Sequence, residues 1–174
     1  MIRAEHKPIH RFFFKRYIHR LMKKRFHRII HLGALPVIET DKPLLITPNH
    51  ISWWDGFFVD LFIDRALPGR KIHLMMLEEQ LQKYTFFRNV GAFSVNPGKP
   101  KSVVESLLYA AEKLQSPENA VVIFPQGVIE SQMKQELTFQ QGVAKLAGYT
   151  KQPFNVMPLF FKIYYGSERE PDLY

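Results

Sequence analysis

Short apolar runs alternate along the chain with segments whose apolar residues recur every three or four positions. The runs predict β-strands at residues 44–47, 72–76, 92–95, 120–124 and 156–163, and the periodic segments predict helices at 56–66, 101–114 and 139–147. The strand at 120–124 contains Val121-Val122-Ile123-Phe124, a continuously apolar run typical of strands buried on both faces. This alternation predicts an α/β fold with a mostly parallel or mixed sheet flanked by helices.

The first 34 residues follow another pattern, in which apolar residues at helical spacing are interrupted by basic ones. Residues 1–28 hold ten Lys or Arg against the single acid Glu5, whereas the remaining 146 residues are close to neutral. We therefore expect a basic amphipathic helix over residues 1–34, followed by one domain over residues 35–174. The apolar positions expected to form its face are Phe14, Ile18, Leu21, Met22, Phe26, Ile29 and Ile30.

Three interpretations of this basic segment are open. It can lie in a membrane surface, with its apolar face in the acyl boundary and its charges on anionic lipids, or it can pack on the body. These two are compatible. Nucleic-acid binding is the third interpretation, and we do not expect it because the body is neutral and lacks a recognition motif.

Membrane association, if it occurs, is expected to be peripheral. Charges interrupt the segment every few residues, so that nothing approaches the roughly 18 uncharged apolar residues of a spanning helix. The apolar core and cleavage site of a signal peptide are also missing. We therefore expect the protein on the cytoplasmic face of a membrane.

The composition excludes several kinds of chemistry. The chain has no cysteine, which rules out disulfides, thiolate nucleophiles and zinc–cysteine sites. Five of the seven histidines fall in the basic segment without paired acidic residues at metal-ligand spacing, so no metal site is expected.

His50 and Asp55 are the first candidates for catalysis. They follow the predicted strand at 44–47 and are five positions apart, which separates them on a regular helix. The pair can therefore meet only where the chain turns from strand into helix. There the carboxylate can hold one imidazole nitrogen protonated and leave the other free to accept a proton from a hydroxyl.

Two more predicted strands end in candidate loops. Residues 96–99 follow the strand at 92–95, and residues 125–131 follow the strand at 120–124. Because chemistry in such sheets gathers at the carboxyl ends of strands, the three loops are expected to converge on one crevice. Gly127 allows close backbone approach, and N–H groups in its turn can receive a developing oxyanion.

Taken together, these segments resemble the glycerolipid acyltransferase superfamily, which includes the lysophospholipid and glycerol-3-phosphate acyltransferases. Asn49-His50 with Asp55 resembles its His-x4-Asp motif, and Gly91-Ala92-Phe93-Ser94-Val95 resembles its second block. Phe124-Pro125-Gln126-Gly127 resembles the third block, normally Phe-Pro-Glu-Gly, and Val156-Met157-Pro158-Leu159 resembles the fourth.

The resemblance implies acyl transfer from a thioester of coenzyme A or acyl carrier protein to a hydroxyl of a lipid-like acceptor, without a further cofactor. His50 would be the general base and Asp55 its orienting partner. The substrate-binding residues implied by the blocks and by nearby charge are Asn49, Arg88, Lys99, Phe124, Pro125, Gln126 and Gly127.

Departures from the family pattern bear on the acceptor. Pro97 stands where phosphate-using members carry an arginine, and the third block has Gln126 and no arginine after it. Because a planar cation suits a phosphate, these losses favour an acceptor without phosphate, such as a glycolipid or a glycosylated carotenoid or similar pigment. A lysophosphatidate-type acyltransferase and an inactive membrane-bound scaffold remain as alternatives.

Overall fold

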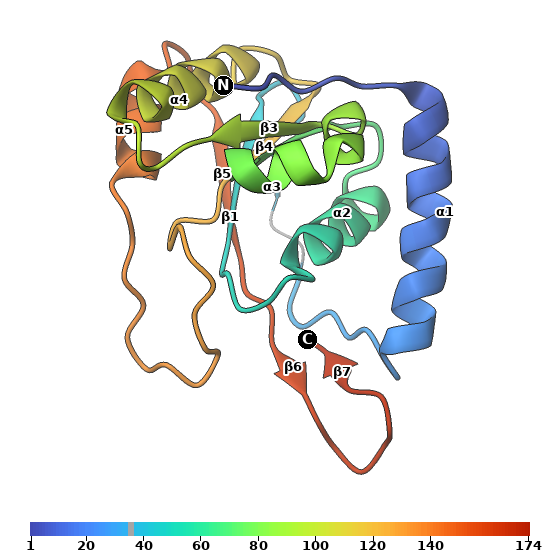
Figure 1. Ribbon diagram of the computed structural model, residues 1–174. Coiled ribbons are helices and arrows are strands. Elements are labelled where there is room, and N and C mark those ends of the chain that lie inside the picture. The colour runs from blue at the N-terminus through green and yellow to red at the C-terminus, as the bar shows by residue number, and fades with distance from the viewer. Residues whose placement is uncertain (35–36) are drawn as a thin grey trace.

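A five-stranded parallel sheet forms the centre of the molecule (Figure 1). The computed structural model describes residues 1–34 and 37–174. The strands are β1 (Leu44–Pro48), β2 (Lys71–Leu77), β3 (Ala92–Val95), β4 (Asn119–Val122) and β5 (Asn155–Leu159), in the order β3-β2-β4-β1-β5. All pairings in this sheet are parallel. The prediction of an α/β fold with a mostly parallel sheet is confirmed.

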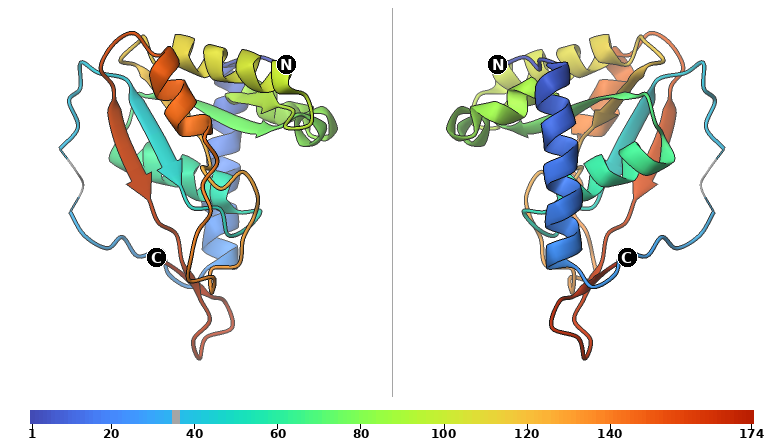
Figure 2. Two further views of the ribbon diagram at one scale, coloured as in Figure 1. Left: turned by 90° about the vertical axis from the view of Figure 1, so that its left-hand side faces the viewer. Right: turned by 90° about the vertical axis from the view of Figure 1, so that its right-hand side faces the viewer.

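Helices cover both faces of the sheet (Figure 2). Alternate residues of a strand point to opposite faces, and β1 shows this clearly. Leu44 and Ile46 pack in one core with α1 (Pro8–Arg25) and α2 (Asp55–Ala66). Leu45 packs in a second core with α4 (Pro100–Lys113) and α5 (Gly142–Tyr149). Because β1 is buried on both faces, the loop that follows it starts from a rigid support.

The N-terminal helix is docked on the body and is shorter than expected. It buries Phe14, Ile18 and Met22 against α2 and the sheet, so the packing interpretation of its apolar face is confirmed. It ends at Arg25 rather than near residue 34. Ile29, expected on the helix face, instead forms a bridge with Leu173. The predicted domain boundary at residues 34 and 35 lies at the edge of the described residues, since residue 35 is outside them.

Ion pairs between α1 and α2 fix how the first helix docks. Arg11 pairs with Asp60 and Lys15 pairs with Asp64, one helical turn further along both helices. Burial raises the pKa of the Asp60 carboxyl, and the charge of Arg11 opposes this rise. Breaking a pair of this kind from one side leaves a buried charge without a partner, which is strongly destabilising. The charges of Arg11 and Lys15 are therefore already paired within the protein.

Several boundaries differ from the sequence prediction because local contacts stop the elements early. β4 ends at Val122, and Phe124 leaves the strand to stack on His50. α5 begins at Gly142 rather than residue 139, after the Gln140 N–H has bonded to the Pro125 carbonyl. The predicted strand 156–163 is two strands, because β5 ends at Leu159 and β6 (Ile163–Tyr164) pairs antiparallel with β7 (Asp172–Leu173).

Two short helical elements were not predicted. α3 (Glu78–Lys83) and the 3-10 helix η1 (Thr85–Asn89) connect β2 to β3. Each is too short to show a helical period in the sequence.

Gly91, immediately before β3, provides a test of the packing. Its φ is +111°, and a Cβ placed there would lie 2.0 Å from the Ile72 carbonyl oxygen. We expect Gly91→Ala to lower the free energy of unfolding by about 3 kcal/mol or more, since backbone strain and a backbone clash add. Chemical denaturation with intrinsic fluorescence measures this change.

Gly148→Ala is the matched control. Gly148 lies in α5, and a Cβ there would meet nothing within 4 Å. It should leave the free energy of unfolding unchanged or raise it by up to about 1 kcal/mol. Equal stability of the two variants would contradict the tight approach of β2 to Gly91.

Candidate active site

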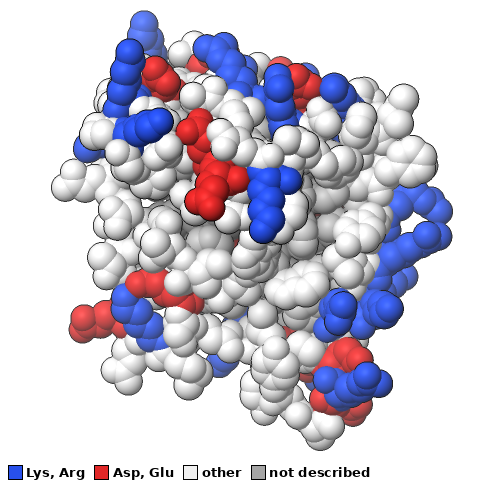
Figure 3. Space-filling model, viewed as in Figure 1, with Lys and Arg blue, Asp and Glu red and all other residues white. Residues whose placement is uncertain are grey.

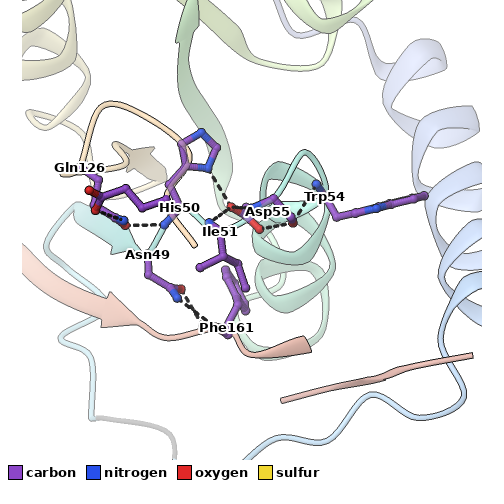
Figure 4. Close-up of polar contacts among 9 residues, drawn as sticks. Asn49, His50, Ile51, Trp54, Asp55, Gln126 and Phe161 are labelled. Atoms are coloured by element: carbon purple, nitrogen blue, oxygen red, sulfur yellow. Dashed lines mark hydrogen bonds and ion pairs between the residues drawn. The ribbon is translucent and has the colours of Figure 1, made fainter. Parts of the chain in front are cut away.

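His50 and Asp55 meet where β1 gives way to α2 (Figure 4). His50 is two positions after Pro48, the last residue of β1, and Asp55 is the first residue of α2. The chain turns between them, and the Nδ1 atom of His50 lies 2.7 Å from Oδ2 of Asp55. The sequence prediction that the two side chains meet only at a strand-to-helix turn is confirmed.

The carboxylate of Asp55 organises the whole turn. It is fully buried, and Oδ2 also accepts the N–H groups of Ile51 at 2.7 Å and Ser52 at 2.9 Å. Its other oxygen, Oδ1, accepts the Ser52 hydroxyl at 2.6 Å. An ionised carboxylate is an acceptor only, so His50 donates its Nδ1–H to it. This leaves the lone pair on His50 Nε2.

The His50 ring is held flat against an aromatic side chain. Its centroid lies 4.3 Å from that of Phe124, with 25° between the ring planes. The side chain is 23% exposed, and its Nε2 atom has no hydrogen-bond partner among the described residues. The imidazole is thus fixed in orientation while its basic nitrogen stays available.

The third block holds the backbone of His50 from the other side. The His50 N–H donates to Oε1 of Gln126 at 2.6 Å, and the Glu130 N–H donates to the His50 carbonyl at 2.8 Å. Gln126 also donates through Nε2 to Glu130 Oε2 at 2.8 Å. The bond from Lys134, and then that from Gln126, lowers the pKa of the Glu130 carboxyl, which is therefore ionised at neutral pH.

Asn49 has a different task from the one expected of it. Its side chain donates to the Phe161 carbonyl at 2.9 Å and accepts the Phe161 N–H at 2.7 Å. Both polar ends are thereby used, and the side chain is buried. Asn49 ties the loop after β1 to the chain just beyond β5 and is not on the wall of the cavity beside His50.

A cavity of about 430 Å³ opens beside the imidazole. Its wall is mostly apolar and is formed by α2, β2, β3 and the third block. Asp60, already paired with Arg11, is its only charged lining residue among the described residues. The apolar lining includes Phe57, Leu74, Met76, Val95, Phe124 and Val128.

The turn at Gly127 borders the same cavity. Gly127 has a φ of +73°, and its N–H donates within the turn to the Phe124 carbonyl at 3.1 Å. The N–H of Gly127 itself is therefore used within the turn. The N–H groups of Val128 and Ile129, which also border the cavity, have no acceptor among the described residues.

The two cations proposed from sequence lie elsewhere. Arg88 pairs with Glu5 of the N-terminal segment at 2.5 Å, and Lys99 precedes α4 with its side chain exposed. Neither lines the cavity beside His50. Gln126 is also off the cavity wall, because its side chain is buried under the loop that carries His50. The Pro125 carbonyl bonds to the Gln140 N–H at 2.8 Å.

A second pocket, of about 730 Å³, has a mixed polar and apolar wall and lies at the other side of the same loop. Ser52 and Trp54 contribute to its wall. Lys24, Arg25 and Arg169 bring positive charge to it, and Glu170, which pairs with Arg169 at 3.7 Å, brings one negative charge. These cations come from the end of α1 and from the segment between β6 and β7. Residues 24–25 and residue 169 are far apart along the chain, so no local sequence pattern connects these cations.

Two residues of the site have no assigned role in the sequence analysis. Ser52 bonds to Asp55 and also accepts the Trp54 N–H at 3.1 Å, and its place inside the motif is the signal that could have identified it. Glu130 contacts both His50 and Gln126. No sequence signal marks it, since its contacts depend on how the third-block loop folds.

Comparison with known families agrees with this geometry. The family model described as Acyltransferase matches residues 8–162, which include the loop from His50 to Asp55 and the third and fourth blocks. No curated protein shows significant similarity to the chain. A match over most of the sequence, together with the meeting of His50 and Asp55, places the chain in the Acyltransferase family of the glycerolipid acyltransferase superfamily.

Proposed function

We propose that this protein is an O-acyltransferase that moves a fatty acyl group from a thioester to a hydroxyl of a lipid-like acceptor. The observation that carries the proposal is the His50 imidazole, held at Nδ1 by Asp55 and unpartnered at Nε2 beside an apolar cavity. The family match supports acyl transfer in general. A positioned imidazole of this kind can act as a general base on a hydroxyl.

The proposed reaction is a direct transfer. Nε2 of His50 takes the proton of the acceptor hydroxyl while the hydroxyl oxygen attacks the carbonyl carbon of the thioester. The carbon–sulfur bond then breaks, an ester forms, and the imidazolium returns the proton to the thiolate. The chain has no cysteine to form an acyl-enzyme. The free N–H groups of Val128 and Ile129 can stabilise the oxyanion.

The apolar cavity fits the acyl chain of the donor. Its wall carries Leu74, Met76 and Val95, which suit hydrocarbon, and its rim carries the base His50. The donor is proposed to be acyl-CoA or an acyl carrier protein, whose polar carrier would stay outside this cavity. No further cofactor is proposed.

The charge around the site favours an acceptor without phosphate. The cavity beside His50 has no Lys or Arg among its described lining residues, and Arg88 is already paired with Glu5. A glycolipid, or a glycosylated carotenoid or similar pigment, meets this condition. Lysophosphatidate-type acylation is the second candidate, favoured by Lys24 and Arg25 at the pocket across the loop.

Replacement of His50 tests the reaction. We expect His50→Ala to lower acyl transfer by about 10²–10⁴-fold, because the general base is lost. Purified protein is incubated with acyl-CoA or acyl carrier protein and membrane lipid extract, and products are identified by mass spectrometry. The product's mass shows whether the acceptor carries phosphate.

His31→Ala is the matched control, because His31 is exposed and does not line the cavity beside His50. It should transfer acyl groups like the unmodified protein. Turnover that survives in His50→Ala would contradict the proposed base. If the unmodified protein transfers nothing from any donor, the alternative of an inactive membrane-bound scaffold replaces the enzyme proposal.

The outer face of α1 supports a membrane surface as the partner. Phe12, Phe13 and Tyr17 are each more than half exposed there, beside the exposed Arg16 and Arg20. Figure 3 shows basic side chains along the α1 edge of a face whose middle is mostly uncharged. Among the described residues, no helix combines the length and the apolar character needed to cross a bilayer. We propose peripheral binding to anionic lipids on the cytoplasmic side, and no binding to nucleic acid.

Removing the exposed rings tests this contact. We expect the double change Phe12→Ser with Phe13→Ser to weaken binding to vesicles of mixed neutral and anionic phospholipid by roughly tenfold or more, as apolar area at the interface is lost. Co-sedimentation measures the apparent Kd. The rings are 58% and 63% exposed, so the fold should survive.

An exposed apolar residue on the opposite side of the sheet is the control. Leu108 on α4 is 50% exposed, and Leu108→Ser should leave vesicle binding unchanged. Equal loss of binding in the two variants, or none in either, would contradict a membrane contact through α1.

A further inference from the structure

Gln126 lies between a hydrogen-bond donor and a hydrogen-bond acceptor, and its amide bonds to both, which an ionised carboxylate cannot do. On one side the His50 backbone offers an N–H, which needs an oxygen. On the other side the Glu130 carboxylate offers an oxygen, which needs an N–H. A glutamine presents one of each, whereas an ionised glutamate presents oxygens only. Gln126 is 1% exposed, so water cannot replace a missing partner.

Glu130 completes this arrangement from the same loop. Its backbone N–H holds the His50 carbonyl, and its carboxylate accepts from both Gln126 and Lys134. The carboxylate therefore fixes which end of the Gln126 amide faces His50. Both polar backbone groups of the general base depend on these two residues.

We propose that Gln126 and Glu130 are a matched positioning pair, in which the amide at 126 is required because a carboxylate stands at 130. The pair acts through the backbone of His50 and touches no substrate. It accounts for the departure of the third block from Phe-Pro-Glu-Gly, because a glutamate at 126 would face the Glu130 carboxylate. The inference rests on the proposed acyl transfer.

Exchanging the two side chains tests the pair more sharply than removing either. In Gln126→Glu alone, two carboxylates meet, and one can be accommodated only when it is protonated. In the exchange Gln126→Glu with Glu130→Gln, the carboxylate at 126 accepts from the His50 N–H and from the new amide at 130. The oxygen of that amide still accepts from Lys134, so each of the three contacts has a partner.

Acyl transfer is measured between pH 5 and pH 8 for these variants. We expect Gln126→Glu to be about tenfold or more slower at pH 8 and to recover toward pH 5, where protonation relieves the repulsion. The exchanged protein should come within roughly threefold of the unmodified protein at pH 8 and lack this additional pH dependence. Gln135→Glu, an exposed change of the same kind on the same loop, should follow the unmodified profile.

Either of two results would contradict the proposal that Gln126 and Glu130 form a matched positioning pair. One is a Gln126→Glu protein with an unmodified rate and pH profile, and the other is an exchanged protein no better than Gln126→Glu. Thermal unfolding tests the pair even if the protein proves not to be an acyltransferase, because it does not depend on activity. The Tm of Gln126→Glu should fall more at pH 8 than at pH 5 and be restored by the exchange, even if no acyl transfer is detected.

Discussion

The buried carboxylate of Asp55 is the constraint on which the site depends. Four donors converge on it within six residues of chain: the His50 ring, the N–H groups of Ile51 and Ser52, and the Ser52 hydroxyl. These hydrogen bonds stabilise the turn between β1 and α2, and the one from the His50 ring also orients the imidazole. A buried carboxylate is tolerated only when it is well hydrogen-bonded. The same hydrogen bonds to Asp55 therefore determine both the conformation of the turn and the orientation of the His50 ring.

The strand order decides which sequence blocks share the site. β4 and β5 are the two neighbours of β1, so the loops after them supply Gln126 and Phe161 to the backbone around His50. β3 is separated from β1 by β2 and β4, a lateral distance of roughly 14 Å at the usual strand spacing. Lys99, which follows β3, therefore does not reach His50, although its loop also follows a carboxyl strand end.

Periodicity and residue type were sufficient to predict the alternating α/β order and the meeting of His50 with Asp55, because both follow from local patterns. The roles of Asn49, Gln126 and Arg88 were not predictable in this way. Each depends on a partner far along the chain, namely Phe161, the His50 backbone and Glu5. The end of α1 at Arg25 was missed for a similar reason, since Ile29 continues the helical spacing but is taken up by a bridge to Leu173.

The central claim is that Asp55 holds the proton of His50 on Nδ1 and leaves Nε2 basic. Nitrogen-15 NMR of histidine-labelled protein reports this directly, with the His50 signals identified by their absence from a His50→Ala sample. For the neutral ring, we expect a single tautomer with Nδ1 protonated and Nε2 without a proton. A ring protonated at Nε2, or one exchanging freely between tautomers, would contradict it.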